Sequence, residues 1–139
     1  MSKMIKNIEK IAPDEEILEG TFKSNFFRSD IDDELSVCIR NGEIIDYAEK
    51  CIEHFNSLPD DVIDKICEGI IESCEEEYEL ENVRDILEYC WFTSMAVDVP
   101  ENDGISYVID GEGEWGEVVG FVIKDGSLAY VGIDFEEYL

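Results

Sequence analysis

The chain of 139 residues is strongly acidic: 36 Asp and Glu side chains stand against 10 Lys and Arg, which gives a formal net charge of −26. The hydrophobic content of 45% is that of an ordinary globular domain, so the high charge does not indicate disorder. The length fits one domain. The negative charge argues against direct binding to nucleic acid or to anionic lipid, because positive charge supplies most of the affinity for both. A basic partner, or none, is what the composition favours.

The sequence carries none of the patterns expected of an exported or membrane protein. The first ten residues alternate Lys with single apolar residues and contain no apolar signal segment. The longest apolar runs are only a few residues long, too short to span a membrane. An odd number of cysteines without CxxC spacing predicts reduced, mostly buried thiols: Cys38, Cys51, Cys67, Cys74 and Cys90. We therefore expect a cytoplasmic protein.

A β-hairpin is predicted in residues 17–40. The segment 17–27 is rich in β-branched and aromatic residues with partial alternation, and the segment 35–40 alternates apolar and polar side chains. The acidic cluster in residues 30–34 lies between them and predicts an exposed turn.

Residues 42–90 change to the three- and four-residue spacing of amphipathic helices. The first apolar stripe covers residues 44–55, with Asn41 as its cap. Pro59 begins the second helix, because proline fits the first helical turn, and the apolar stripe of this helix continues to Tyr78.

A short third helix is predicted in residues 83–90. Asn82 precedes it as a cap, and Asp85 stands three residues later, which is the spacing of a capping box.

Residues 93–132 return to the two-residue period of strands and predict an antiparallel sheet. Asp125 and Gly126 give the strongest hairpin signal, since this pair accommodates the positive φ angles of a tight turn. The predicted strands are residues 93–99, 105–110, 118–124 and 128–132. The order predicts an α+β fold in a single domain, residues 1–139: an N-terminal β-hairpin, two to three helices, and a C-terminal antiparallel sheet of three to four strands, with the helices packed on one sheet face.

One pair of residues offers an enzyme-like reading. Cys51 and His54 are three apart on the first predicted helix and could share a face as nucleophile and base. However, Cys51 falls on the apolar stripe, where a cysteine behaves as a small hydrophobic residue, and His54 near a helix end is favoured by the helix dipole as a surface residue. Zinc-ligand spacing, a calcium loop and a phosphate-binding loop are all missing from the sequence. We predict no catalytic residue, no cofactor and no metal, and keep an enzyme as a disfavoured alternative.

The distribution of acidic residues is more informative. Twelve Asp and Glu lie between residues 60 and 90, where Lys65 and Arg84 are the basic residues. One interpretation is a solvated face that keeps the protein soluble. The other is a single-sign ridge that steers a basic partner. The candidate partner-binding residues of this acidic ridge are Asp61, Asp64, Glu68, Glu72, Glu75, Glu76 and Glu79. All of them except Glu76 are predicted on the side of the second helix opposite its Ile and Cys stripe.

A second candidate segment surrounds Trp115, which stands between glycines and the acids Glu112 and Glu114. The favoured interpretation is that Trp115 covers the core of the sheet. The alternative is an exposed interface anchor, because tryptophan is enriched at binding hot spots. We therefore count Glu112, Glu114 and Trp115 among the candidates, and a small-ligand or cation-binding module built on this segment is the alternative function.

The C-terminal third carries a signature: Tyr107-Val-Ile-Asp-Gly-Glu-Gly-Glu-Trp115, followed by Gly120-Phe-Val-Ile-Lys-Asp-Gly-Ser-Leu-Ala-Tyr-Val-Gly132. It resembles the C-terminal signature of a family of small, acidic bacterial domains of unknown function, which share the order of hairpin, two helices and sheet. Some members resemble immunity proteins of polymorphic toxin systems. The resemblance implies the same fold. With the acidic ridge, it leads us to expect a non-enzymatic domain that binds a protein and neutralises a basic toxin.

Overall fold

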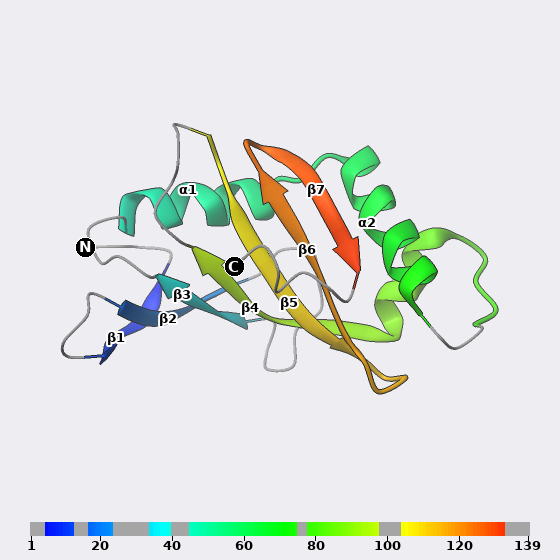
Figure 1. The fold of residues 1–139 in the computed structure, drawn as a ribbon, viewed down its shortest axis with the longest axis horizontal. Coiled ribbons are helices and arrows are strands. Elements are labelled where there is room, and N and C mark those ends of the chain that lie inside the picture. Colours follow the sequence, from blue (N-terminus) through cyan, green and yellow to red (C-terminus); the bar gives the residue numbers. More distant parts are fainter. Residues whose placement is uncertain are drawn as a thin grey trace.

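The computed structural model describes residues 5–12, 17–23, 34–39, 45–74, 78–97 and 104–132. Within these ranges, seven strands form one mixed sheet whose order follows the sequence from β1 to β7 (Figure 1). Between β3 and β4, the described residues include two α-helices and one 3-10 helix: α1 (Ile45–Phe55), α2 (Asp60–Ser73) and η2 (Val83–Glu88). The strands are β1 (Lys6–Ala12), β2 (Ile17–Lys23), β3 (Glu34–Ile39), β4 (Cys90–Val97), β5 (Tyr107–Gly113), β6 (Val118–Lys124) and β7 (Ser127–Gly132).

The predicted hairpin is present, and an additional strand extends it. β2 and β3 pair antiparallel, with Phe22 opposite Leu35. β1 pairs with β2 in an irregular register. No strand was predicted in this part of the chain. An edge strand has only one neighbouring strand, so its sequence can lack a strong alternation of apolar and polar residues. Lysines, which the sequence of β1 contains, are typical of sheet edges.

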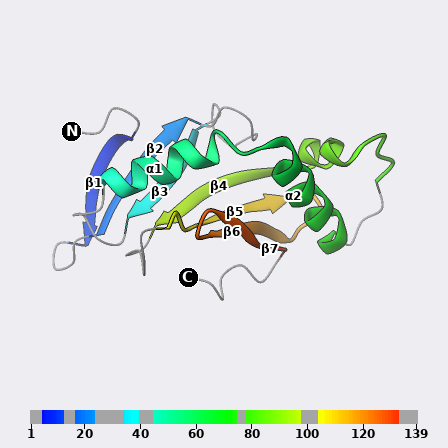
Figure 2. The same ribbon diagram turned by 90° about the horizontal axis from the view of Figure 1, so that it is seen from above.

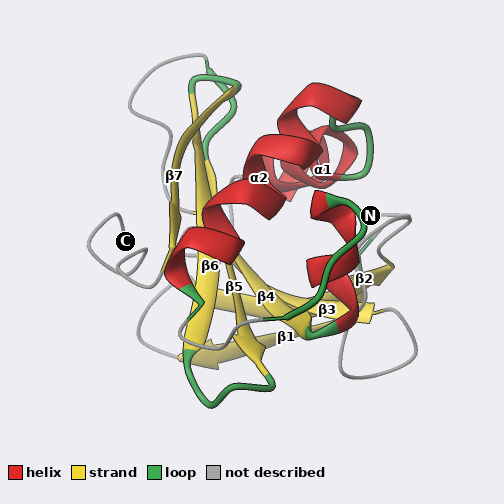
Figure 3. Ribbon diagram, turned by 90° about the vertical axis from the view of Figure 1, so that its right-hand side faces the viewer, coloured by secondary structure: helices red, strands yellow, loops and turns green. Residues whose placement is uncertain are grey.

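A parallel pairing between β3 and β4 joins the hairpin to the C-terminal strands. Parallel neighbours need a long crossover, which α1, α2 and η2 supply. Figure 3 shows both α-helices on the same side of the sheet. The predicted α+β fold with helices on one sheet face is therefore confirmed. β4 to β7 are antiparallel as expected, but the sequence pattern did not predict that both groups of strands share one sheet.

The core lies between the helices and the sheet face that they cover. Phe55 of α1 packs against the rings of Phe22, Tyr107 and Phe121, with ring centroids 6.0, 6.4 and 6.2 Å away. Seen from above in Figure 2, α1 lies over the N-terminal strands and α2 over the other end of the sheet. The buried residues of α2 are Ile63, Ile66, Cys67 and Ile70.

Helix α2 begins after Pro59, as predicted, but it ends at Ser73 instead of continuing to Tyr78. Cys74 already has an extended backbone. The sequence explains the early end, because residues 75–77 are consecutive glutamates. A longer helix would place their charges at the negative end of its dipole, with no basic side chain in the last turn to offset them. The predicted helix was therefore too long.

The third predicted helix is present as η2, and its capping box is confirmed. The Asn82 side chain accepts a hydrogen bond from the Arg84 backbone N–H at 3.0 Å, and the Asp85 carboxylate accepts one from the Asn82 backbone N–H at 3.2 Å. Both bonds are local, which is why spacing alone predicted them.

The boundaries of the C-terminal strands agree with the sequence pattern to within a few residues. β4 begins earlier than predicted, at Cys90, and β5 begins later, at Tyr107. The predicted turn at Asp125 and Gly126 is confirmed, with φ angles of 53° and 77°. The predicted cap at Asn41, residues 30–33 of the predicted acidic turn, and residues 98–99 of the predicted strand 93–99 lie outside the described residues.

Candidate functional site

The acidic side chains of α2 spread over an arc of about 120° opposite the buried stripe of the helix, and their surroundings differ across this arc. Asp60 and Asp64 are one turn apart and face η2, because both contact a side chain from that element. Gly69 marks the other side: a Cβ placed there would come 2.5 Å from Cβ of Val131 in β7. A further three acidic residues lie within about 100° of Gly69 around the helix axis. They are Asp61, Glu68 and Glu72.

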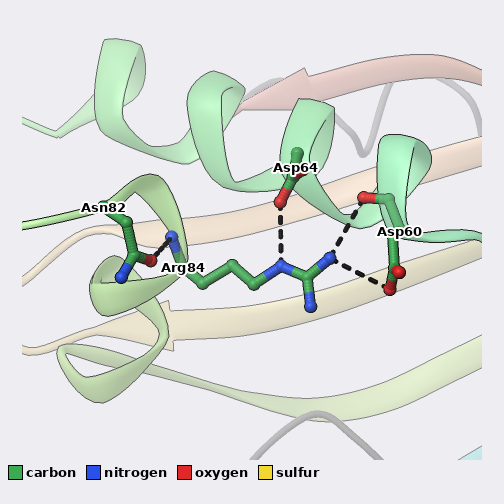
Figure 4. Close-up of polar contacts among 4 residues, drawn as sticks. All are labelled: Asp60, Asp64, Asn82 and Arg84. Carbon is green, nitrogen blue, oxygen red and sulfur yellow. Dashed lines mark hydrogen bonds and ion pairs between the residues drawn. The ribbon is translucent and has the colours of Figure 1, made fainter.

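Arg84 of η2 neutralises the side of α2 that faces it (Figure 4). Its Nε lies 2.8 Å from a carboxylate oxygen of Asp64, and its Nη2 lies 3.1 Å from a carboxylate oxygen and 3.2 Å from the backbone oxygen of Asp60. The hydrogen bonds to Asp64 and Asp60 raise the pKa of the Arg84 guanidinium above its usual value. Asp64, a predicted partner-binding residue, therefore pairs with Arg84 and holds η2 against α2.

The other acidic group, which we call the β7-side row, consists of Asp61, Glu68 and Glu72. All three side chains are exposed, and within the described part of the chain none forms an ion pair. Lys65 is exposed on the same side of the helix. The anionic surface of α2 is thus narrower than the predicted ridge.

The remaining acidic candidates do not extend this row along one helix. Glu75 and Glu76 lie outside the described residues. Glu79 is exposed but lies in the segment between α2 and η2, so its predicted place on the second helix is wrong. Glu114 is exposed just after β5. Glu112 is exposed on β5 and alternates with residues of the core side, so it faces away from the helices.

Trp115 packs against the protein interior. Its ring lies 6.2 Å from that of Tyr78, and a Cβ on Gly113 would come 2.5 Å from the indole, so the absence of a side chain there makes room for the ring. The indole Nε1 is buried and has no hydrogen-bond partner in the described structure. The favoured interpretation, that Trp115 covers the core, is confirmed, and the indole is not the exposed anchor of the alternative.

A polar cluster that was not predicted from the sequence lies on the sheet face opposite the helices. An irregularity in the β4–β5 register places Thr93 and Ser94 together opposite Asp110. Both hydroxyls donate hydrogen bonds to the Asp110 carboxylate, that of Thr93 at 3.2 Å. Trp91 lies half-buried on the same strand. The alternation of polar residues in β4 and β5 was the available signal, but only the register brings them together.

Cys51 is a core residue, as the favoured interpretation predicted. Its side chain is 0% exposed, and its thiol lies 3.6 Å from the backbone oxygen of Ser106. Burial raises the pKa of the thiol from 9.0 to about 12. A thiol that keeps its proton and is buried is a poor nucleophile, and this environment is typical of a cysteine that serves packing.

His54 is more than the surface residue that its position near a helix end suggested. Its ring is half-buried in the last turn of α1. Nδ1 lies 2.8 Å from the Tyr107 hydroxyl, and Nε2 lies 3.3 Å from the backbone oxygen of Gly126. His54 therefore connects α1 to β5 and to the β6–β7 turn.

The described residues contain no group of three or more His, Cys, Asp or Glu side chains arranged to hold a metal ion. No helix in the described ranges has the length and apolar character needed to cross a membrane. All five cysteines lie in these ranges, and none forms a disulfide.

Comparison with known protein families identifies the domain family of the chain. A model of DUF6985, a domain of unknown function, matches residues 7–136. The chain belongs to the DUF6985 family. The DUF6985 match runs from β1 to beyond β7, so it includes both α-helices and the whole polar cluster. No curated protein and no solved structure matches the chain.

Proposed function

We propose that this DUF6985 domain is a non-enzymatic binding module for a basic protein. More specifically, it acts as an immunity protein that neutralises a basic toxin. The observation that carries the proposal is the β7-side row, in which Asp61, Glu68 and Glu72 are exposed and form no ion pair within the described residues.

The contrast between the two sides of α2 supports this function. Where carboxylates serve the fold, as at Asp60 and Asp64, the chain supplies Arg84 to pair with them. A surface that only confers solubility usually mixes both signs of charge, because a single-sign surface repels itself. On the β7 side the acids outnumber the exposed Lys65, so the surplus charge is available to an external cation.

A basic toxin is the partner that fits this surface best. The net charge of −26 would steer a basic protein toward the domain from a distance, and carboxylates in a row offer it an arrangement like that of phosphates. A nuclease whose cleft binds phosphates is such a protein. We place the encounter in the cytoplasm, where thiols stay reduced, in keeping with five cysteines that form no disulfide.

The test compares two triple variants with the same change in net charge. The first neutralises the β7-side row by Asp61→Asn, Glu68→Gln and Glu72→Gln. The control neutralises exposed acids on β1, β2 and α1 by Glu9→Gln, Glu19→Gln and Glu53→Gln. Each is co-expressed with the product of the neighbouring gene, and rescue from toxicity and complex formation are scored.

We expect the wild type and the control to rescue growth and to form a complex, while the first variant loses affinity by about tenfold or more, as loss of several charge contacts would cause. Absence of a complex with the wild type, or equal affinity of the two variants, would overturn the proposal.

A further inference from the structure

The sheet face away from α1 and α2 carries a surface that the proposed function does not use (Figure 3). Side chains of β5 alternate between the two faces of the sheet: Ile109 belongs to the core, while Asp110 and Glu112 lie on the outer face. Neither β4 nor β5 contains a Lys or an Arg. This part of the outer face is therefore acidic.

The strand register places two apolar side chains beside Glu112. Trp91 of β4 and Val118 of β6 are its partners in the two neighbouring strands, and residues directly opposite each other have Cβ atoms about 4.5–5.5 Å apart. Val118 is 46% exposed, and within the described ranges no other large hydrophobic side chain is exposed. Trp91 is half-buried. The exposed Glu112 thus lies between a tryptophan and an exposed valine.

Asp110 adds a second carboxylate that is fixed in position. It lies two residues before Glu112 on the same face of β5, so their Cα atoms are about 7 Å apart. The hydroxyls of Thr93 and Ser94 both donate to Oδ1 of Asp110 and hold its side chain toward β4. Its other oxygen, Oδ2, accepts no hydrogen bond from the residues that the structure describes, so it can accept one from an external donor.

We propose that these side chains form a docking surface for an arginine of a protein partner. We call it the outer-face patch and define it as Trp91, Asp110, Glu112 and Val118. The guanidinium group donates hydrogen bonds to the carboxylates of Glu112 and Asp110. Its planar face packs on Trp91, and its alkyl stem packs on Val118. This inference goes beyond the proposed function, because the β7-side row belongs to a helix on the other side of the sheet.

The chemistry of the patch favours arginine over lysine or a metal ion. A guanidinium group is planar, stacks on aromatic rings and donates from two nitrogens at once to carboxylates. Lysine presents a more strongly hydrated point charge, which gains less from a tryptophan beside it. A metal ion would use only the carboxylates, and the described residues contain no group of three or more metal-ligating side chains.

Charge disfavours a second copy of this chain as the occupant. Pairing of two outer faces would bring the acids of two patches together between molecules that each carry −26. Like charges at that distance repel, whereas a basic segment gains from the same field over about 8 Å at physiological ionic strength. The patch therefore fits a heterologous partner.

The test follows the binding of short peptides by proton–nitrogen correlation NMR of the labelled protein, in about 0.15 M salt. The first peptide is Gly-Arg-Thr-Arg-Gly with blocked ends. The second has lysine in place of both arginines, and the third has citrulline, which keeps the shape of arginine without its charge. Each is titrated into the wild type and into the Glu112→Gln, Val118→Thr and Glu53→Gln variants. Glu53→Gln is the matched control, because it removes one charge at an exposed position of α1.

We expect the arginine peptide to shift the backbone signals of Asp110, Glu112 and Val118 and the indole N–H signal of Trp91. Glu112→Gln should weaken its binding about threefold, the effect of one surface charge pair, whereas Glu53→Gln should leave the binding unchanged. Val118→Thr should weaken it about twofold, because less apolar surface is buried. The lysine and citrulline peptides should bind more weakly than the arginine peptide to the wild type.

Absence of binding, equal affinity of the arginine and citrulline peptides, or equal effects of Glu112→Gln and Glu53→Gln would overturn the inference. Signal shifts confined to other surfaces would do the same. Equal affinity of the lysine peptide would overturn the choice of arginine. Concentration-dependent shifts of the same signals without peptide would assign the patch to a second copy of the chain. The β7-side row is judged separately, by the co-expression test.

Discussion

The hydroxyl group of Tyr107 lies 2.8 Å from Nδ1 of His54, and the other ring nitrogen, Nε2, lies 3.3 Å from the backbone oxygen of Gly126. A carbonyl oxygen can only accept, so Nε2 carries the hydrogen and Nδ1 accepts from the tyrosine. Tyr107 is 2% exposed, and burial raises the pKa of its hydroxyl, which stays protonated. One histidine thus satisfies a buried hydroxyl and ties the β6–β7 turn to α1.

Replacing His54 by Ala should therefore destabilise the fold. The Tyr107 hydroxyl would be left buried without an acceptor, which costs about 1–3 kcal/mol in the free energy of unfolding. Urea denaturation measures the loss. Tyr107→Phe removes the hydroxyl itself and should cost less, and adding it to His54→Ala should cost less than the sum of the two. Wild-type stability in His54→Ala would contradict the assigned hydrogen bond.

The raised pKa of Cys51 predicts how the free energy of unfolding depends on pH. Its thiol keeps its proton in the folded chain up to about pH 12, while the unfolded chain loses it near pH 9.0. The unfolded state binds fewer protons between these values, so the free energy of unfolding falls as the pH rises through this window. Below it both states are protonated, and Cys51 contributes no pH dependence.

The comparison is between the wild type and Cys51→Ala, by urea denaturation at a series of pH values with a reductant present. Besides burial, Cys51 also raises the pKa values of Tyr47 and Tyr107, so the series stays below pH 10.0, where the tyrosines keep their protons in both states. The wild type should lose stability faster above pH 9.0, by at most about 1.4 kcal/mol per pH unit. Parallel curves would show that the Cys51 thiolate is tolerated in the fold.

We predict that replacing Arg84 increases the binding of a basic partner to α2. In Arg84→Gln, the carboxylates of Asp60 and Asp64 lose their guanidinium partner and join the anionic surface of α2. The association rate with the basic partner protein of the co-expression test should rise about two- to fivefold at low salt, a factor typical of one surface ion pair, and the difference should vanish at high salt. Stopped-flow fluorescence measures the rate.

Lys50→Gln is the matched control for this prediction, because it makes the same change in net charge at an exposed position of α1 and leaves the charged side chains of α2 and η2 unchanged. The Arg84 variant should exceed it. If both variants raise the association rate equally, the overall net charge is responsible for the increase. The ion pairs of Arg84 with Asp60 and Asp64 then do not limit the charge that α2 offers to a partner.

Gly113 should not tolerate a side chain. A Cβ there would come 2.5 Å from three atoms of the Trp115 indole, so Gly113→Ala must displace the ring. We expect a loss of about 1–3 kcal/mol, as in other overpacked sites, and a red-shifted Trp115 emission. Trp91→Phe serves as the background, since the chain has two tryptophans. Unchanged emission in Gly113→Ala would place the indole elsewhere.

Local patterns were enough to predict several features of the fold. The capping box of Asn82 and Asp85 and the turn at Asp125 and Gly126 depend on residues at most three apart, so their spacing in the sequence is their spacing in the structure. The two-residue period also predicted β6, and the apolar stripe predicted the start of α2 after Pro59. The end of α2 was harder to predict, because the apolar stripe of the sequence continues past the point where the helix dipole disfavours further acidic residues in the helix.

The candidate surface depended more on tertiary structure. Glu68 and Glu72 were predicted on the solvent side of the second helix, since that side is opposite the Ile and Cys stripe. The pairing of Arg84 with Asp64 joins residues 20 positions apart, and no spacing rule connects them. The packing of Trp115 on Gly113 and Tyr78 likewise follows from how the chain folds back on itself.

The sequence by itself therefore determined the charge, the α+β class and most of the local elements, because these depend on composition and on neighbours along the chain. Tertiary structure alone decided that β3 pairs with β4 and which carboxylates are neutralised. The physical reason is that the energy of a charge or a strand edge depends on what lies beside it in space. Of the side chains that give the net charge of −26, only those that the fold leaves without a cationic neighbour are available to an external cation.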